Sequence, residues 1–163
     1  MSSLSDPKIS VEIVEYKSRY SKDFHDINVR WLEAYFEIEP YDRIVLEDPF
    51  GQIIAHGGFI FFAKVGGAVV GTCALIKQTE KKYELAKMGV LEESRGLGIG
   101  RLLALAAIDK ARSLGAEKVV LATSKKLEAA NHLYRSLGFI SVDRSQIGPL
   151  PYHRESIVMA LSL

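Results

Sequence analysis

The stretch VLEESRGLGIGR at residues 90–101 decides the fold of this chain. It connects an apolar segment typical of a β-strand to a run rich in Leu and Ala, residues 99–114, that predicts a helix. Gly96, Gly98 and Gly100 alternate through the connection and leave its backbone uncovered by side chains. Backbone N–H groups at a helix N-terminus bind anions, because the positive end of the helix dipole lies there. The stretch therefore predicts a strand, a phosphate-binding loop and a helix in succession.

The residues around these glycines limit which phosphate compound the loop can bind. Arg95 and Arg101 supply charged donors for phosphate oxygens. The dinucleotide fingerprint G-x-G-x-x-G is not met, since positions 101 and 103 are Arg and Leu. No Gly-Lys-Ser/Thr follows to make a nucleotide-binding P-loop. A dinucleotide and a nucleoside triphosphate are therefore disfavoured, and a glycine-rich turn without a ligand is the alternative interpretation.

Strand and helix patterns alternate on both sides of this loop. Helices are predicted over residues 21–36, 99–114 and 127–137, with a short one after Pro40. Strands are predicted over residues 9–16, 59–65, 69–77, 83–90, 118–123, 139–142 and 156–161. Meandering strands followed by strand–helix pairs predict an α/β fold, a mixed sheet with helices on both faces. The length of 163 residues fits one domain over residues 1–163.

Composition and charge argue against several classes of partner. The net charge of +1 gives no footprint for nucleic acid. No run of about 18 apolar residues predicts a membrane span. The N-terminal residues are polar and lack the apolar stretch of a signal peptide, so a cytoplasmic location is expected. The apolar last strand makes a homodimer possible.

The sequence also gives no sign of a metal site or a catalytic thiol. The single cysteine, Cys73, lies in an apolar strand and is expected to be a small buried core residue. The histidines at positions 25, 56, 132 and 153 show no ligand spacing. We therefore expect no metal.

The glycine loop is similar to a known family signature. Residues 95–100, RGLGIG, resemble the pyrophosphate signature Q/R-x-x-G-x-G/A of the GNAT superfamily of N-acetyltransferases. In that family the loop follows the fourth strand, opens the next helix and binds coenzyme A. The resemblance therefore implies acetyl-CoA as the cosubstrate. It implies a binding loop made of Arg95, Gly96, Leu97, Gly98, Ile99, Gly100 and Arg101.

A second stretch, residues 123–139, resembles the other hallmark of that family. Asn131 and Tyr134 share one face of the predicted helix, where a polar amide and a phenol need partners. The resemblance implies that Asn131 bonds the coenzyme and that Tyr134 reaches the thioester sulfur. For Tyr134 the alternative is a core tyrosine with a satisfied hydroxyl.

The strand before the loop, residues 83–90, resembles the family's fourth strand. That strand splays from the fifth at a bulge and holds the pantetheine arm through its backbone, which implies contacts at Met88, Gly89 and Val90. Gly89 suits a bulge or a close backbone approach, and the Met88 N–H is a candidate donor to the thioester oxygen. Glu84 is a candidate general base. A solvated glutamate at a strand end is the alternative.

The acceptor is the least determined part. Residues 31–50 hold six acidic residues and one basic residue, with aromatic neighbours, which suits a cationic amine. An ordinary solvated helix face is the alternative, and Arg154 is a candidate for meeting a substrate carboxylate. Residues 31–42, with 57–60 and 84–88, also resemble a bacterial subgroup of the family that occurs alone and fused behind MarR-type DNA-binding domains. We expect acetyl transfer by direct attack onto a primary amine of a small molecule. Acetylation of protein N-termini or lysines, or a non-catalytic acyl-CoA sensor, are the alternatives.

Overall fold

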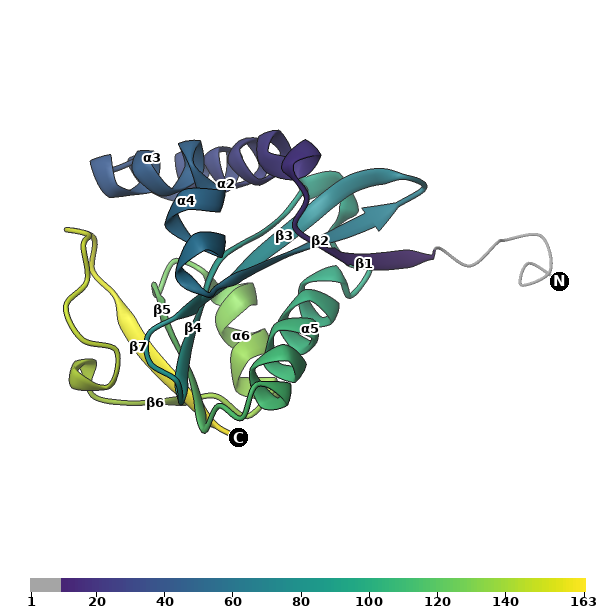
Figure 1. The fold of residues 1–163 in the computed structure, drawn as a ribbon. Coiled ribbons are helices and arrows are strands. Elements are labelled where there is room, and N and C mark those ends of the chain that lie inside the picture. The colour runs from purple at the N-terminus through teal and green to yellow at the C-terminus, as the bar shows by residue number, and fades with distance from the viewer. Residues whose placement is uncertain (1–9) are drawn as a thin grey trace, which may run out of the picture.

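The computed structural model describes residues 10–163, and its core is one seven-stranded sheet (Figure 1). The strand order is β1-β2-β3-β4-β5-β7-β6. The β4–β5 pair is parallel and all other neighbours are antiparallel, so the sheet is mixed as expected. The strands are β1 (Val11–Glu15), β2 (Phe59–Val65), β3 (Ala68–Lys77), β4 (Lys82–Val90), β5 (Lys118–Thr123), β6 (Ile140–Ser141) and β7 (Ile157–Ser162). Residue 9, the expected start of the first strand, lies outside the described residues.

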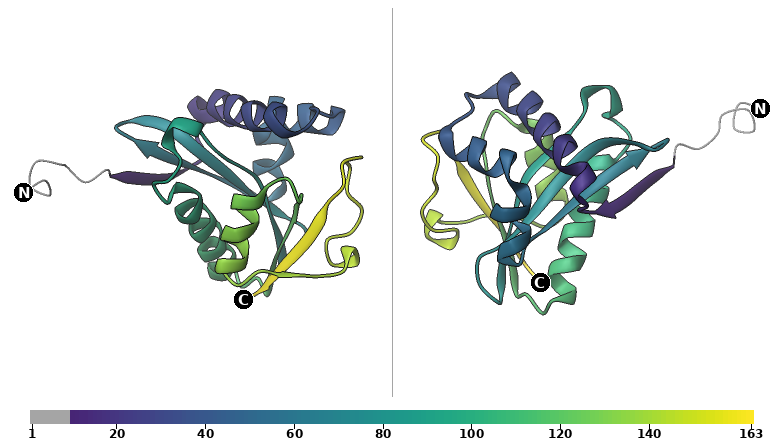
Figure 2. Two further views of the ribbon diagram at one scale, coloured as in Figure 1. Left: turned by 180° about the vertical axis from the view of Figure 1, so that it is seen from behind. Right: turned by 45° about the horizontal axis from the view of Figure 1, so that its top comes forward.

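Helices cover both faces of the sheet, which confirms the expected α/β class (Figure 2). One face carries α2 (Ser21–Tyr35), α3 (Pro40–Glu47) and α4 (Pro49–Gln52). The other carries α5 (Ile99–Ser113) and α6 (Glu128–Ser136). Four short 3-10 helices lie in the connections: η1 (Ser18–Tyr20), η2 (Ile54–His56), η3 (Glu92–Ser94) and η4 (Arg144–Gln146). Within residues 10–163, no helix is both long and apolar enough to cross a membrane.

Alternation along the strands divides the buried side chains between two cores. Phe61, Cys73 and Leu85 pack under α5, while Phe62 and Ala74 pack under α2 and α3. The β2–β3 hairpin turns at two glycines with positive φ, as the sequence predicts. The expected strand over residues 139–142 is shorter than predicted. Only Ile140 and Ser141 join the edge of the sheet, and both are exposed, so little apolar burial holds a longer strand there.

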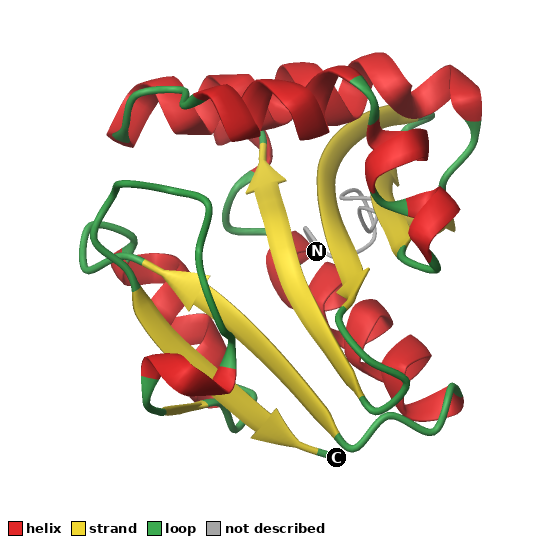
Figure 3. Cartoon of the chain, turned by 60° about the vertical axis from the view of Figure 1, so that its left-hand side comes forward, coloured by secondary structure: helices red, strands yellow, loops and turns green. Residues whose placement is uncertain are grey.

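Strands β4 and β5 separate soon after they meet. Their pairing is confined to three residues of each strand, from Lys82 with Lys118 to Glu84 with Val120. Beyond Glu84, β4 continues to Val90 without a neighbour on that side, and Figure 3 shows the two strands diverging like a V. This splay gives the sheet two free backbone edges that face each other.

A β-bulge in β4 accompanies the splay. The register with β3 shifts so that Lys87 and Met88 together lie opposite Cys73. Lys87 adopts φ 52°, and no other residue with a side chain beyond Cα has positive φ within residues 10–163. The bulge is therefore at Lys87 and Met88 and not at Gly89. Gly89 instead allows a close approach, because a Cβ there would lie 2.5 Å from Cδ1 of Trp31.

Candidate active site

A cavity of about 430 Å³ fills the gap between the splayed strands. Its walls come from five places: the end of α2, the free edge of β4, the end of β5, the loop that opens α5, and one face of α6. We call this cavity the groove. Among the residues that line it are Lys87, Met88, Gly89, Val90, Arg95, Gly96, Gly98, Ile99, Gly100, Arg101, Thr123 and Tyr134. Most of the residues that the sequence indicated are thus brought together.

The glycine loop presents a row of unused backbone donors to the groove. Within residues 10–163, no hydrogen-bond partner exists for the N–H groups of residues 96–101. Gly96 and Gly98 have φ values of 83° and 74°, which side chains rarely adopt, and a Cβ at either position would meet nothing within 4 Å. The loop is therefore shaped by its glycines and left open, as an anion site at a helix N-terminus requires.

The two arginines of the loop line the groove, whereas Leu97 does not. Arg95 and Arg101 line the groove, and Arg101 also donates from Nη1 to Ser136 Oγ over 3.1 Å. Leu97 is 40% exposed and does not line the groove, so its expected contact with the coenzyme stays a prediction. The donor set, two guanidinium groups with a row of N–H groups, fits a pyrophosphate.

Tyr134, on α6, is one of the residues that line the groove. Its ring packs edge-on against Phe139, with centroids 5.9 Å apart, and its residue is 8% exposed. Burial and the nearby Cys73 thiol raise the pKa of the Tyr134 hydroxyl, which therefore keeps its proton. No side chain or carbonyl in residues 10–163 bonds this hydroxyl. Since Tyr134 lines the groove, its unpartnered hydroxyl is available to bond a ligand there.

Asn131 has a different contact from the one expected. Its Oδ1 accepts from Thr123 Oγ1 over 2.7 Å, and its Nδ2 donates to the Ser124 carbonyl over 2.9 Å. The side chain is buried and does not line the groove. Asn131 thus ties α6 to the end of β5 and fixes one wall, while a direct bond to coenzyme stays a prediction.

Glu84 lies at the last β4–β5 pair, at the base of the splay. Gln78 donates to its carboxylate over 3.3 Å. Burial raises the pKa of Glu84, and the Gln78 bond and the Lys87 charge only partly oppose this. The residue does not line the groove. A proton reaching Glu84 from the groove must therefore cross an intervening group or water.

A buried network of charges on the other side of β4 was not predicted from the sequence. Lys87 donates from Nζ to Asp42 Oδ1 over 3.0 Å and to the Tyr152 hydroxyl over 2.9 Å. Arg154 pairs with the same Asp42 carboxylate, and its Nε lies 3.3 Å from Glu39 Oε2. Burial opposes ionisation of Asp42, but the Lys87 charge and three hydrogen bonds outweigh it and lower the pKa of that carboxyl. We call these five residues the Asp42 network.

Only weak signals in the sequence pointed to this network. Asp42 is the third residue of a helix that begins at Pro40, and it forms a capping box with Glu39. Lys87 is the one charged residue among the alternate positions of β4 that are buried, residues 83, 85, 87 and 89. Arg154 was expected to bind a substrate carboxylate. Its guanidinium is already paired with the carboxylates of Glu39 and Asp42, so a substrate carboxylate would have to compete with them.

A second cavity, of about 640 Å³, adjoins this network. Tyr35 lines both cavities. Its carboxylates include Glu33 and Glu37, as the acidic composition predicted. The aromatic wall is partly used by the chain's own cations, since Lys126 and Arg154 lie 5.2 and 5.4 Å from the Phe36 ring. Within residues 10–163, no group of three or more His, Cys, Asp or Glu residues has an arrangement suited to a metal ion.

Comparison with known proteins agrees with this geometry. The profile of the acetyltransferase (GNAT) family matches residues 21–139. The N-acetyltransferase YvbK of Bacillus subtilis is 31% identical over 104 residues, which cover 62% of this chain and 67% of YvbK. N-alpha-acetyltransferase 30 of Schizosaccharomyces pombe is 29% identical over 134 residues, which cover 82% of this chain and 87% of the relative. Membership of the subgroup found fused to MarR-type domains stays a prediction.

Solved structures share the fold. A GNAT-family acetyltransferase of Staphylococcus aureus superposes with a TM-score of 0.85 at 22% identity, over 94% of this chain and 99% of that one. The PaiA N-acetyltransferase of Thermoplasma acidophilum, in complex with coenzyme A, superposes with a TM-score of 0.76 at 17% identity, over 94% and 99% of the two chains. The profile, the relatives and the splayed sheet agree: this chain belongs to the GNAT family and is an N-acetyltransferase.

Proposed function

We propose that the protein transfers an acetyl group from acetyl-CoA, by direct attack, onto the primary amine of a small molecule such as an amino acid or a polyamine. One observation carries this proposal. Gly96, Gly98, Ile99, Gly100 and Arg101, whose N–H groups have no partner within residues 10–163, line the same groove as Tyr134, whose hydroxyl has none there either. The PaiA structure, which holds coenzyme A on this fold, supports coenzyme A as the occupant.

The chain's residues suit the proton transfers of such a reaction. When bound, acetyl-CoA supplies an acetyl group activated as a thioester. An alkyl amine with an ordinary pKa near 10 arrives protonated, and a base must accept its proton. Glu84 suits this role, because burial raises its pKa toward neutrality and makes the carboxylate a stronger base. The Met88 N–H is a donor for charge that develops on the thioester oxygen, and the Tyr134 hydroxyl is a donor for the sulfur.

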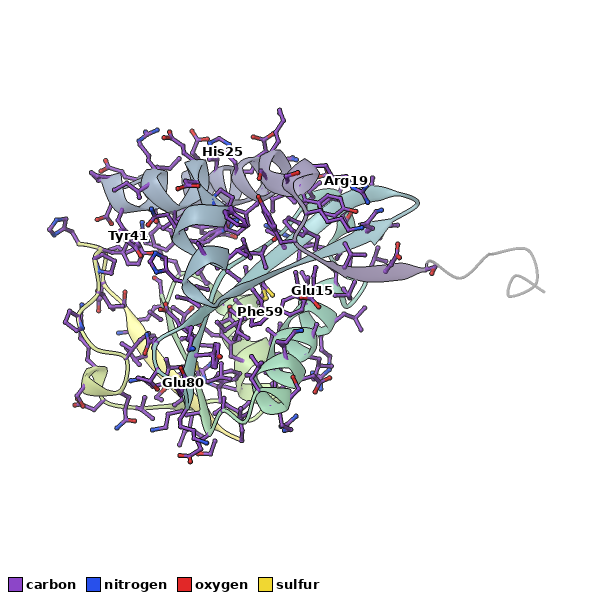
Figure 4. All side chains as sticks on the ribbon, viewed as in Figure 1. Glu15, Arg19, His25, Tyr41, Phe59 and Glu80 are labelled. Carbon is purple, nitrogen blue, oxygen red and sulfur yellow. The ribbon has the colours of Figure 1, made fainter. Side chains whose placement is uncertain are left out.

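The acceptor end of the site supports a small molecule. Tyr41 and Tyr152 pack edge-on, with ring centroids 5.6 Å apart, and Figure 4 shows Tyr41 on α3 facing the C-terminal segment. The His153 N–H donates to Glu39 Oε1 over 2.8 Å, and Arg154 pairs with Asp42. The segment before β7 is thereby fastened to α3, which narrows the approach to β4 from this side.

A second candidate acceptor is the N-terminus of a protein. The Schizosaccharomyces pombe relative, which matches 82% of this chain, is named an N-alpha-acetyltransferase, and this favours the alternative. A peptide must thread into the acceptor end, so this function requires the fastened segment to move away from α3.

Release of free thiol from acetyl-CoA tests both candidates. The purified protein is incubated with amino acids, polyamines, aminoglycosides and short peptides in turn. We expect release with a small amine, and release with peptides alone would replace the first candidate with the second. Binding of acetyl-CoA by calorimetry without release from any amine would favour the sensor. If acetyl-CoA does not bind and no amine causes thiol release, the proposed function is refuted.

A further inference from the structure

Lys87 combines two features that are each costly. It is buried, whereas lysine is among the residues least often found inside proteins. Its backbone also has φ 52°, a left-handed conformation that costs a residue with a side chain about 1 kcal/mol. Both features occur at the bulge of β4, beside the groove. A costly conformation at such a place persists only if surrounding contacts hold it there.

The Asp42 network supplies those contacts. The Lys87 ammonium is held by Asp42 and Tyr152 at 3.0 and 2.9 Å, and lies 4.9 Å from the centre of the Tyr152 ring. Asp42 is itself fully buried and is fixed by the Glu39 N–H and by Arg154. The side chain of Lys87 is therefore tied at its far end to α3 and to the segment before β7.

This tie acts on the backbone where the reaction is proposed to occur. In a bulge, one residue of the pair is left outside the ladder, so its backbone groups are not fixed by the neighbouring strand. Here that pair is Lys87 and Met88, which lie together opposite Cys73 and line the groove. The conformation of Lys87, which its side-chain contacts hold in place, therefore sets the direction of the backbone at Met88.

We propose that Lys87, held by Asp42 and Tyr152, is a positioning residue that fixes the β4 bulge so that the Met88 N–H is directed at the thioester oxygen. The inference rests on the proposed function. A positioning role for Lys87 predicts changes in the hydrogen bond to the acetyl carbonyl and in the turnover rate. It predicts no change in the affinity for the rest of the coenzyme, which a purely structural role would also alter.

The carbonyl stretch of bound acetyl-CoA reports this hydrogen bond directly. Acetyl-CoA labelled with carbon-13 at the thioester carbonyl is bound without an acceptor and followed by infrared difference spectroscopy. A directed N–H lowers the carbonyl frequency relative to free acetyl-CoA. We expect Lys87→Met to lose at least half of that lowering and about 10- to 100-fold in kcat. The dissociation constant for coenzyme A without an acetyl group should change by less than about 3-fold.

Two further variants keep the test decisive. Lys82→Met makes the same change at the other end of β4, where Nζ bonds the Gln146 carbonyl, and should leave frequency and kcat unchanged. If Lys87→Met does not fold, Asp42→Asn weakens the same tie with little change of shape, and the same loss is expected. A folded variant of either kind with the frequency and kcat of the original protein would overturn the inference. Failure of the original protein to bind acetyl-CoA would instead refute the proposed function.

Discussion

The two sides of β4 differ in whether their polar groups have partners within the protein. On the groove side, the N–H groups of residues 96–101 and the Tyr134 hydroxyl have no partner within residues 10–163. On the acceptor side, Lys87 and Arg154 each donate to Asp42, and of the fully buried side-chain polar atoms in residues 10–163 only Arg154 Nε lacks a hydrogen bond. Buried polar groups are rarely left unpaired unless a ligand or water completes them. The groove side is therefore prepared to bind, and the acceptor side is prepared to hold its own shape.

The largest effect should come from breaking the paired side. Asp42→Ala leaves the Lys87 ammonium and the Arg154 guanidinium buried without their shared carboxylate. Removing one member of a buried ion pair costs about 3–5 kcal/mol. We expect the free energy of unfolding in urea to fall by that amount.

Asp48→Ala is the matched control on the next helix. Asp48 is exposed and accepts from the Gly51 N–H at the start of α4, so its loss should cost about 1 kcal/mol. If the two variants unfold at the same urea concentration, the Asp42 network does not hold the acceptor side.

A smaller effect is expected from adding a charge to the unpaired side. Gly98→Glu brings a carboxylate to the loop that opens α5 and forces a side chain into φ 74°. Repulsion between this carboxylate and a phosphate should raise the dissociation constant for acetyl-CoA about 100-fold, which corresponds to about 3 kcal/mol. Calorimetry measures the change. Gly67→Glu is the control, because Gly67 has φ 83° and open space around it in the β2–β3 turn, and it should bind acetyl-CoA normally.

The unpaired side is also the side that the sequence predicted. Its residues are contiguous in the chain: the glycines of residues 96–100 and the helix face that carries Tyr134 are local patterns, and each has a direct geometric meaning. The strand and helix order follows for the same reason, because alternation and helical spacing are also local.

The paired side could not be predicted, because its members are distant in sequence. Asp42 lies 45 residues from Lys87 and 112 from Arg154, and no local pattern relates them. Only the folded sheet brings the start of α3, the β4 bulge and the segment before β7 together. The position of the bulge was missed for the same reason. A glycine signals backbone freedom or small size, and at Gly89 it is the small size that Trp31 requires, while the left-handed conformation lies at Lys87.

Removing the Tyr134 hydroxyl should separate binding from turnover. Because this hydroxyl has no partner within the described part of the chain, Tyr134→Phe should leave the free energy of unfolding unchanged or slightly higher. We expect kcat to fall about 100-fold, the lower end of the range for loss of a proton donor, with little change in the affinity for acetyl-CoA. Tyr83→Phe, at an equally buried tyrosine in the same core, should change neither quantity. A Tyr134→Phe enzyme with the original kcat would show that the unpaired hydroxyl has no catalytic role.

The smallest expected effect is on the pH dependence of stability, and it comes from replacing Glu84, the proposed base. Burial raises the pKa of Glu84 above its ordinary 4.5, so the folded protein holds this proton more tightly than the unfolded chain does. Stability from this group is then complete below pH 4.5 and is lost as pH rises through the folded pKa. Glu84→Gln removes the loss, so in urea it should be more stable than the original protein at pH 7 and not at pH 4. Glu80→Gln should behave in the opposite way, because Lys77 lowers the pKa of Glu80. Since Glu84→Gln should also abolish the rise of kcat with pH, a variant that is more stable at pH 7 but fully active would show that burial strains this carboxylate and that it is not the base.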